Sequence, residues 1–135
     1  MYNQPVVPPQ HPKPRTLTLD EFFHGYEPSR HLFDVVQEAI ESIGPCELRI
    51  TKSQIAFHRR KTFAWTWIPA KYLRGKTAPL VLSLSLPARN PSSRWKEIVE
   101  PYPGRFIHHL ELFSVEDINE ELRAWLWEAW LSADW

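Results

Sequence analysis

Two adjacent histidines, His108 and His109, are the residues of this chain whose types most directly suggest chemistry. They fall in a predicted strand, where neighbouring side chains point to opposite faces, so one metal cannot bind both imidazoles from one side. His108 has the parity of the apolar residues Phe106 and Leu110, which predicts a hydrogen-bonded structural histidine. His109 shares its face with Glu111. Such a pair is either a general acid–base site or an ordinary ion pair, and we favour the ion pair.

The sequence contains neither a serine in a catalytic motif nor a glycine-rich phosphate-binding loop. Ser53, Ser83 and Ser85 lie outside any glycine-flanked elbow of the serine-hydrolase type. The four glycines are scattered and form no phosphate-binding loop. Cys46 is the single cysteine, so neither an intramolecular disulfide nor a thiolate metal site can form, and we expect a buried, inert thiol. We therefore expect no catalytic residue, no metal and no cofactor, and we rank catalysis behind binding.

Charge is unevenly distributed along the chain. The sequence has 16 basic and 16 acidic residues, yet no acid occurs from Leu48 to Lys96. That stretch contains eleven cations: Arg49, Lys52, Arg59, Arg60, Lys61, Lys71, Arg74, Lys76, Arg89, Arg94 and Lys96. The net charge of zero therefore conceals a basic stretch flanked by acidic segments. Such a distribution favours recruitment of an anionic partner, although it does not define a fold.

Aromatic residues alternate with these cations, a combination that holds phosphates and stacks on bases. They are Phe57, Phe63, Trp65, Trp67, Tyr72 and Trp95. Lys61, Lys71, Arg74 and Lys76 fall in predicted turns, where they can follow a phosphate backbone. Because the C-terminal helix is acidic, we expect strands and loops to meet DNA or RNA. In the competing interpretation, the basic strands neutralise the acidic helices of the same domain.

Hydrophobic periodicity predicts two N-terminal helices and one C-terminal helix around these residues. The spacing of Thr18 and Glu21 predicts a capping box at the start of a short first helix. Ser29 is the expected N-cap of the second helix, and Gly44, followed by Pro45, is its expected C′ residue. The last helix is expected to begin at Ser114.

Segments with a period of two predict an antiparallel sheet of about five strands. The expected strands lie near residues 47–51, 54–60, 63–68, 79–86 and 105–113. Short connections make the first three a meander. A longer loop is expected at 87–104, with a helical turn over Trp95. The predicted fold class is therefore α+β, in two layers, with the helices on one face of the sheet.

Strand parity predicts two different faces. The helix-covered face collects large apolar residues, namely Leu48, Ile50, Ile55, Phe57, Phe63, Trp65, Trp67, Leu80, Leu82, Leu84, Leu110 and Leu112. The opposite face, called here the open face, includes the small or hydroxyl-bearing residues Ala56, Ala64, Thr66, Ser83 and Ser85. A shallow trough is expected there, in which Arg49, His58, Arg60 and His109 close on an anion. For any one of these residues, an ordinary solvent-exposed sheet face is a better explanation than an anion site. For the set as a whole it is a weaker explanation, because a neutral solvated face normally carries acids as well as bases.

The chain is long enough to form one domain, expected at residues 17–135. Residues 1–16 form a proline-rich tail, which we interpret as a flexible arm or, alternatively, as a partner-binding arm. No segment has the pattern of a signal peptide or of a membrane span. We therefore expect a soluble cytoplasmic protein with no membrane partner. Nothing in the sequence specifies an oligomeric state.

Several segments resemble an uncharacterised bacterial family, the domain-of-unknown-function family 5655. They are TKSQIAFHRRKTFAWTWIP, VLSLSLP, SSRWKEIVEPYPGRFIHHLEL and DINEELRAWLWEAW. The resemblance covers residues 22–130 and implies a small cytosolic α+β domain, found alone or as a module, without an established activity. Its motifs single out Lys52, Ser53, Arg59, Arg60, Trp65, Trp95, Pro103, Gly104, His108 and His109. The closing helix departs from the family's alanine–tyrosine pair, because here Trp130 follows Ala129.

The order of elements is more distantly similar to that of the YjbR-like and YdhG-like small domains. The former are described as a double-wing DNA-binding type, and the latter have been linked to iron handling. Fold alone does not settle function. An iron site is disfavoured here, because Glu47 and Glu111 are the only carboxylates expected on the open face.

The sequence therefore predicts a non-enzymatic domain that binds an anionic partner, with nucleic acid preferred. A small anionic molecule held by Arg49, Arg60 and His109 is the alternative, and a protein-interaction module is a third class. The predicted binding residues are Arg49, Lys52, Ser53, His58, Arg60, Lys61, Trp65, Lys71, Arg74, Trp95, His109 and Glu111.

Overall fold

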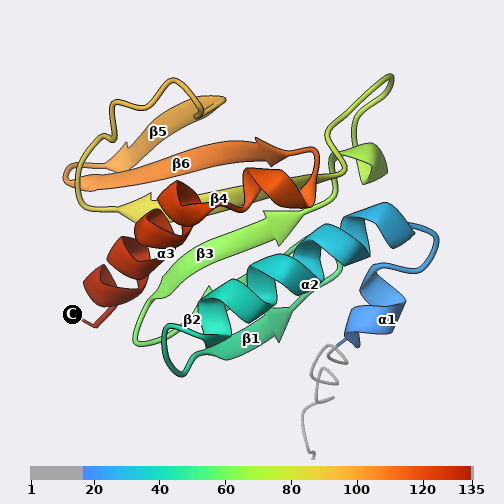
Figure 1. Ribbon diagram of the computed structural model, residues 1–135, viewed down its shortest axis with the longest axis horizontal. Coiled ribbons are helices and arrows are strands. Elements are labelled where there is room, and N and C mark those ends of the chain that lie inside the picture. The colour runs from blue at the N-terminus through green and yellow to red at the C-terminus, as the bar shows by residue number, and fades with distance from the viewer. Residues whose placement is uncertain (1–16, 135) are drawn as a thin grey trace, which may run out of the picture.

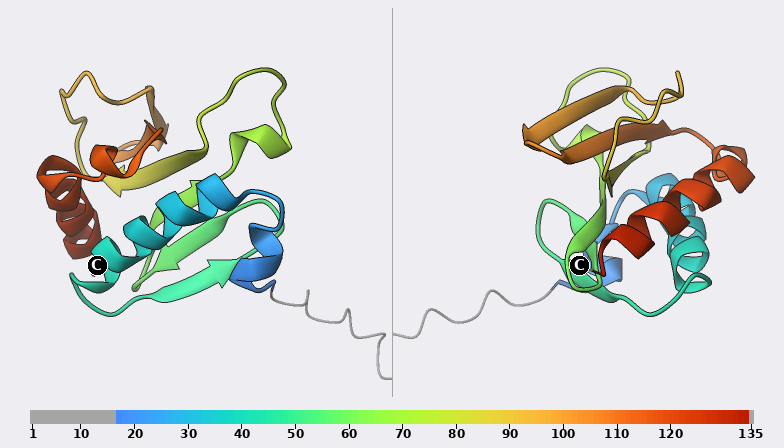
Figure 2. Two further views of the ribbon diagram at one scale, coloured as in Figure 1. Left: turned by 45° about the vertical axis from the view of Figure 1, so that its right-hand side comes forward. Right: turned by 90° about the vertical axis from the view of Figure 1, so that its left-hand side faces the viewer.

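The computed structural model of the protein describes residues 17–134, so the predicted proline-rich arm at 1–16 lies outside the described residues. One six-stranded antiparallel sheet forms one layer, and three α-helices pack on a single face of it (Figures 1 and 2). The predicted α+β class and layer arrangement are confirmed, with one strand more than expected. Within residues 17–134, no helix is long and apolar enough to cross a membrane.

The strands are β1 (Glu47–Ile50), β2 (Ile55–His58), β3 (Thr62–Trp67), β4 (Leu80–Leu86), β5 (Glu97–Tyr102) and β6 (Arg105–Leu112). They lie side by side in the order β1-β2-β3-β4-β6-β5, and every pairing is antiparallel. The first four strands therefore form a meander, and a hairpin of β5 and β6 adds to its far edge (Figure 1). The hairpin turns at Gly104, whose φ of 85° is accessible mainly to glycine.

A β-bulge between β2 and β3 changes the face assignment predicted for β3. His58 pairs with Thr62, whereas Phe57 pairs with Ala64, so Phe63 is an extra residue in β3. Phe63 and Ala64 are consequently both buried in the core. Because the side chains of a strand alternate, one extra residue moves every later side chain of β3 to the opposite face.

The prediction that Trp65 and Trp67 belong to the helix-covered face is therefore wrong. Both tryptophans lie on the open face, and Thr66 lies on the core side with a buried hydroxyl that has no hydrogen-bond partner among residues 17–134. The predicted trough of small residues is also corrected. Trp65 stands between Ala56 and Ser83, its two cross-strand neighbours, so the middle of the open face carries an indole.

Strand β5 was predicted to be part of a loop with a helical turn over Trp95. Instead, Glu97 pairs with His109, and the strand continues as the outer edge of the sheet. Pro101 falls where the register of this pairing shifts. Proline has no amide donor, and it is tolerated here because β5 is an edge strand.

Helices α1 (Leu19–Phe22) and α2 (Glu27–Glu41) precede the sheet. The predicted capping box is confirmed, with the Thr18 amide donating to Glu21 Oε1 at 3.0 Å and the Glu21 amide donating to Thr18 Oγ1 at 3.1 Å. The predicted N-cap of α2 is wrong, because Tyr26 occupies that position. Ser29 is buried in the first turns of α2, and its hydroxyl donates to the Pro79 carbonyl at 2.6 Å. This bond fixes α2 to the segment that leads into β4.

Gly44 is not the C′ residue predicted for α2, because the helix ends at Glu41 with Ser42 as its C-cap, and Gly44 does not have a positive φ. A side chain at this position would instead collide with the indole of Trp130, which lies directly against Gly44. The Trp130 indole N–H also donates to the Pro45 carbonyl at 3.1 Å. Gly44 therefore permits close approach between the α2–β1 connection and helix α3 (Glu120–Ser132).

Helix α3 begins later than predicted. The expected box of Ser114 and Asp117 is present, but it encloses a 3-10 turn, Val115–Asp117. The N-cap of α3 is Asn119, whose side-chain oxygen accepts from the Leu122 amide at 3.1 Å. The predicted capping box of Ser114 and Asp117 therefore exists, but it caps a 3-10 turn that precedes α3 and not the helix itself.

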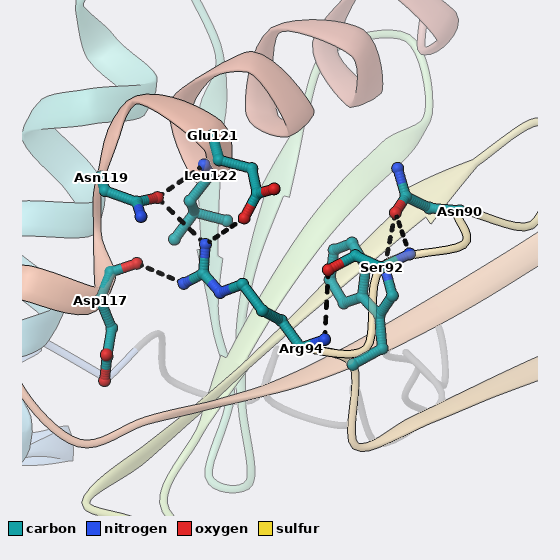
Figure 3. Close-up of polar contacts among 8 residues, drawn as sticks. Asn90, Ser92, Arg94, Asp117, Asn119, Glu121 and Leu122 are labelled. Atoms are coloured by element: carbon teal, nitrogen blue, oxygen red, sulfur yellow. Dashed lines mark hydrogen bonds and ion pairs between the residues drawn. The ribbon is translucent and has the colours of Figure 1, made fainter.

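Arg94, in the loop before β5, fixes the start of α3 (Figure 3). Its Nη1 donates to Asn119 Oδ1 at 3.0 Å and to Glu121 Oε1 at 2.9 Å. Its Nη2 donates to the Asp117 carbonyl at 2.7 Å. A cation of the basic stretch is therefore committed to holding the acidic helix in place.

Candidate functional site

One row of cross-strand neighbours runs across the open face. Its members, one from each strand, are Arg49, Ala56, Trp65, Ser83, His109 and Glu97. An adjacent row contains Trp67, Val81 and Glu111. Ala56 and Ser83 are buried although the helices pack on the other face, because larger neighbours in these rows cover them.

A cavity of about 390 Å³ opens between these rows and the β5–β6 hairpin, and we call it the Trp65 cavity. It is lined by Gln54, Trp65, Trp67, Ser83, Pro101, Tyr102, Arg105, Ile107 and His109. An aromatic and aliphatic wall with a few convergent polar groups is the usual composition of a ligand site. The β2–β3 bulge contributes to this cavity, because it turns both tryptophans of β3 to the open face.

Arg105 is the cation of the Trp65 cavity. Its guanidinium carbon lies 5.7 Å from the Trp65 ring centroid and 5.6 Å from that of Tyr102. Nη1 donates to the Tyr102 hydroxyl at 2.7 Å, and Nη2 donates to the Thr62 carbonyl at 3.4 Å. The buried Nε has no acceptor among residues 17–134. The hydrogen-bonding capacity of this guanidinium is therefore incompletely used within the described part of the chain.

A second cavity of about 450 Å³, the Arg74 cavity, adjoins the first. Its lining comprises Trp67, Pro69, Leu73, Arg74, Lys76, Thr77, Val81, Lys96, Glu97, His109 and Glu111. Trp67 and His109 line both cavities, so the two form one continuous surface. Lys96 is paired with Glu111 at 3.2 Å, whereas Arg74 and Lys76 have no ion-pair partner within residues 17–134.

His109 is hydrogen-bonded to Ser83, with 2.6 Å between Nδ1 and Oγ. The predicted His109–Glu111 ion pair is therefore not formed, and Glu111 binds Lys96 instead. Burial lowers the pKa of His109, and the nearby Glu97 carboxylate only partly opposes this effect. The imidazole is consequently neutral near pH 7.

A serine hydrogen-bonded to a neutral imidazole has the composition of a nucleophile and its base. Ser83, however, lies in the middle of β4, which is paired on both sides with β3 and β6. Backbone amides committed to two strand ladders are unavailable to stabilise an oxyanion. The geometry therefore favours Ser83 and His109 as polar groups that recognise a ligand.

The cations and imidazoles predicted to surround one small anion are not brought together. Arg49 and His109 share a row but are separated by four strand spacings, about 19 Å. Arg60 lies in the β2–β3 turn, with its Nε 3.6 Å from the carboxylate of Asp134. His58 bonds through Nδ1 to the hydroxyl of the first residue of β3 at 3.1 Å.

Lys71, predicted to contact phosphate, has a structural role. Its ammonium donates to the Phe22 carbonyl at 2.8 Å and lies 3.8 Å from the centroid of the Phe22 ring. Burial lowers the pKa of this lysine. Lys52 and Ser53 lie in the β1–β2 turn and Lys61 in the β2–β3 turn, away from the Arg74 cavity.

The structure places Trp95 in the core, although it was predicted to bind a partner. Its ring packs 4.3 Å from that of Trp125 and edge-on to the buried His108 at 4.8 Å, measured between centroids. Its indole N–H donates to Asn90 Oδ1 at 3.0 Å. His108 is fully buried and hydrogen-bonded, so the prediction of a structural histidine is confirmed.

Internal neutralisation accounts for part of the basic stretch. Arg59 stacks on the Trp130 ring, 3.5 Å from its centroid, and donates to the Trp130 carbonyl at 3.2 Å. Arg59 and Arg60 both approach Asp134, and Arg94 pairs with an acid of α3. Five cations of the stretch have no ion pair or hydrogen bond from their side chains within residues 17–134, namely Lys52, Lys61, Arg74, Lys76 and Arg89, and Arg89 lies over the Phe106 ring.

Sequence reasoning missed four contributors to the Trp65 cavity: Gln54, Pro101, Tyr102 and Arg105. Arg105 was detectable, because it shares the parity of Ile107 and His109 in a strand that was correctly predicted. Tyr102 was not detectable in this way, since its segment was interpreted as a loop.

These features define a small antiparallel α+β domain with an aromatic and cationic open face. The chain belongs to the family described as a domain of unknown function (DUF5655), whose model matches residues 19–133. The resemblance seen in the sequence is thereby confirmed for this family. No curated protein and no solved structure matches the chain, so the more distant similarity to YjbR-like and YdhG-like domains remains a prediction.

Proposed function

We propose that this domain binds nucleic acid through its open face and that its role is binding rather than catalysis. The observation that carries the proposal is the position of Trp65 and Trp67. Their indoles lie partly exposed on the face without helices, and Trp67 lines the Arg74 cavity together with Arg74 and Lys76. Aromatic rings stack on bases, and unpaired cations neutralise phosphates, so together they supply the two contacts that a strand requires.

The distribution of charge between the layers supports the same surface. Helix α3 carries the acids Glu120, Glu121 and Glu128 and is disfavoured as a contact with a polyanion. Among the cations of the basic stretch, Arg74 and Lys76 are both free of internal ion pairs and next to the aromatic surface. A phosphate backbone that follows the Arg74 cavity would bring its bases towards Trp67 and Trp65.

A small anionic molecule is the second candidate. The predicted set of Arg49, Arg60 and His109 is dispersed, but Arg105 and His109 both line the Trp65 cavity. The positive charge of Arg105, which forms no ion pair within residues 17–134, supports this candidate. Salt separates the two functions, since binding of a polyanion weakens steeply with ionic strength while a single-site anion loses little.

The proposal is tested by titrating labelled single- and double-stranded oligonucleotides at about 50 mM and about 200 mM salt. We expect binding that weakens steeply with salt. Arg74→Ala and Lys76→Ala should each weaken binding and lower the slope of log K against log salt, by about 0.7 for a single strand. Arg123→Ala is the matched control, because it removes the same charge from α3 in the helical layer.

Two results would contradict the proposal. The first is no binding of either oligonucleotide at the lower salt concentration. The second is equal weakening by Arg74→Ala and Arg123→Ala, which would show that net charge matters but the open face does not.

A further inference from the structure

We infer that the Trp65 cavity takes one unpaired nucleobase, so that the domain is specific for single-stranded nucleic acid. This inference rests on the proposed function and adds to it the form of the nucleic acid and the place of one base. Four features support it: the size and wall of the cavity, its polar groups, its continuity with the Arg74 cavity, and the distribution of charge along that path.

The size and wall of the cavity suit a planar aromatic group. Cavities of about 300–1,000 Å³ hold drug-sized ligands, and the Trp65 cavity has a volume of about 390 Å³. Trp65 and Trp67 line the cavity from β3, and Tyr102, which is 54% exposed, lines it from the β5–β6 hairpin. A base within a duplex is stacked and paired, and its rings cannot enter such a cavity without leaving the helix.

The polar groups of the cavity suit the edge of a base. Arg105 lines the cavity, and its guanidinium carries hydrogen-bond donors. Ser83 and His109 offer a hydroxyl and a neutral imidazole from the floor of the sheet. Carbonyl oxygens and ring nitrogens of unpaired bases are acceptors for such donors, and the exocyclic amines are donors.

Continuity between the two cavities provides a path for the strand. Trp67 and His109 line both cavities, so a nucleotide with its base against Trp65 can place its phosphate towards Arg74 and Lys76. In the Arg74 cavity, Glu111 is already paired with Lys96. The lining of this cavity also includes Glu97, so three cations face two acids, and one excess positive charge adjoins the aromatic wall of the Trp65 cavity.

The test compares a short single strand, its duplex and a free mononucleotide as ligands of the whole chain. We expect the single strand to bind at least about tenfold more tightly than the duplex and than the mononucleotide. Trp65→Leu should weaken binding of the single strand about ten- to a hundredfold and leave binding of the duplex unchanged. Trp127→Leu is the matched control, because Trp127 is a 48% exposed indole on α3.

A second variant protects the test against misfolding of Trp65→Leu. Tyr102→Ala removes an exposed side chain of the same cavity and should also weaken binding of the single strand selectively. A strand that contains 2-aminopurine should lose fluorescence on binding the native protein and lose less with Tyr102→Ala, because stacking quenches this base.

The outcomes separate this inference from the proposed function. If strand and duplex bind equally and Tyr102→Ala changes neither affinity, while Arg74→Ala weakens both, the inference is wrong and the proposed function stands. If the mononucleotide binds as tightly as the strand, the cavity serves a free nucleotide and the inference of strand specificity is overturned. If none of the three ligands binds, both proposals fail.

Discussion

Single residues in this domain are fixed by hydrogen bonds that the sequence only partly reveals, and His108 is the clearest case. Its Nε2 accepts from the Asn90 amide at 3.0 Å, so its Nδ1 carries the proton that is donated to the Phe106 carbonyl at 3.1 Å. Both ring nitrogens are therefore used in the neutral form. Parity predicted the burial of His108, but the bond to Asn90 depends on a loop whose course the sequence did not show.

This geometry predicts that the protein loses stability in mild acid. Burial lowers the pKa of His108 below its ordinary value of 6.5, and burial also lowers that of His109. Above pH 6.5 these groups are neutral in both the folded and the unfolded states, and their contribution to stability is complete. As the pH falls below that value, the unfolded chain takes up protons first, so the free energy of unfolding decreases by up to about 1.4 kcal/mol per pH unit for each group.

Denaturant unfolding at about pH 7.5 and about pH 5.5 measures this loss. His109→Gln should remove part of the pH dependence, whereas His31→Gln, an exposed change on α2, should leave it intact. A free energy of unfolding that is equal at the two pH values would show that these imidazoles are not held neutral by the fold.

At the scale of elements, the contact between the α2–β1 connection and α3 depends on the absence of a side chain at Gly44. A Cβ there would overlap the Trp130 indole, and two further ring atoms would lie 3.0 Å from it. Gly44→Ala should therefore lower the free energy of unfolding by about 1–3 kcal/mol through overpacking. In a chain that already carries Trp130→Ala, the same change should be neutral or slightly stabilising, because alanine reduces the entropy of the unfolded chain.

A double-mutant cycle measured by denaturant unfolding tests this contact. The expected coupling free energy between the two changes is about 1–3 kcal/mol, since the steric cost exists only when both the new Cβ and the indole are present. Purely additive losses would contradict a steric conflict between a side chain at position 44 and the Trp130 indole.

The elements also show how much of the candidate site the sequence could predict. The basic stretch, the antiparallel meander and the open-face position of His109 were all derived from composition and parity. The site itself was misplaced, because a bulge at Phe63 cannot be read from an alternating pattern and reverses the faces of Trp65 and Trp67. Strand β5 was missed because Pro101 disfavours a strand unless the segment lies at an edge, and position in the sheet is not encoded locally.

At the scale of the whole molecule, the divided charge serves two purposes. Arg59, Arg60 and Arg94 hold the acidic C-terminal segment against the sheet. Arg74 and Lys76 remain on the open face without internal ion pairs among residues 17–134. Composition alone could not separate these groups, because pairing depends on which cations the fold places next to α3. The division of charge therefore contributes both to the attachment of α3 and to the proposed surface for a polyanion.

The most direct measurement is an NMR titration that follows the indole N–H resonances while a short single-stranded oligonucleotide is added. The seven tryptophans each contribute one such resonance, and single Trp→Phe variants assign them. We predict that the resonances of Trp65 and Trp67 shift, while those of Trp127 and Trp130 on α3 do not. Shifts confined to the tryptophans of α3, or no shift at a saturating concentration of the strand, would contradict nucleic-acid binding by the open face.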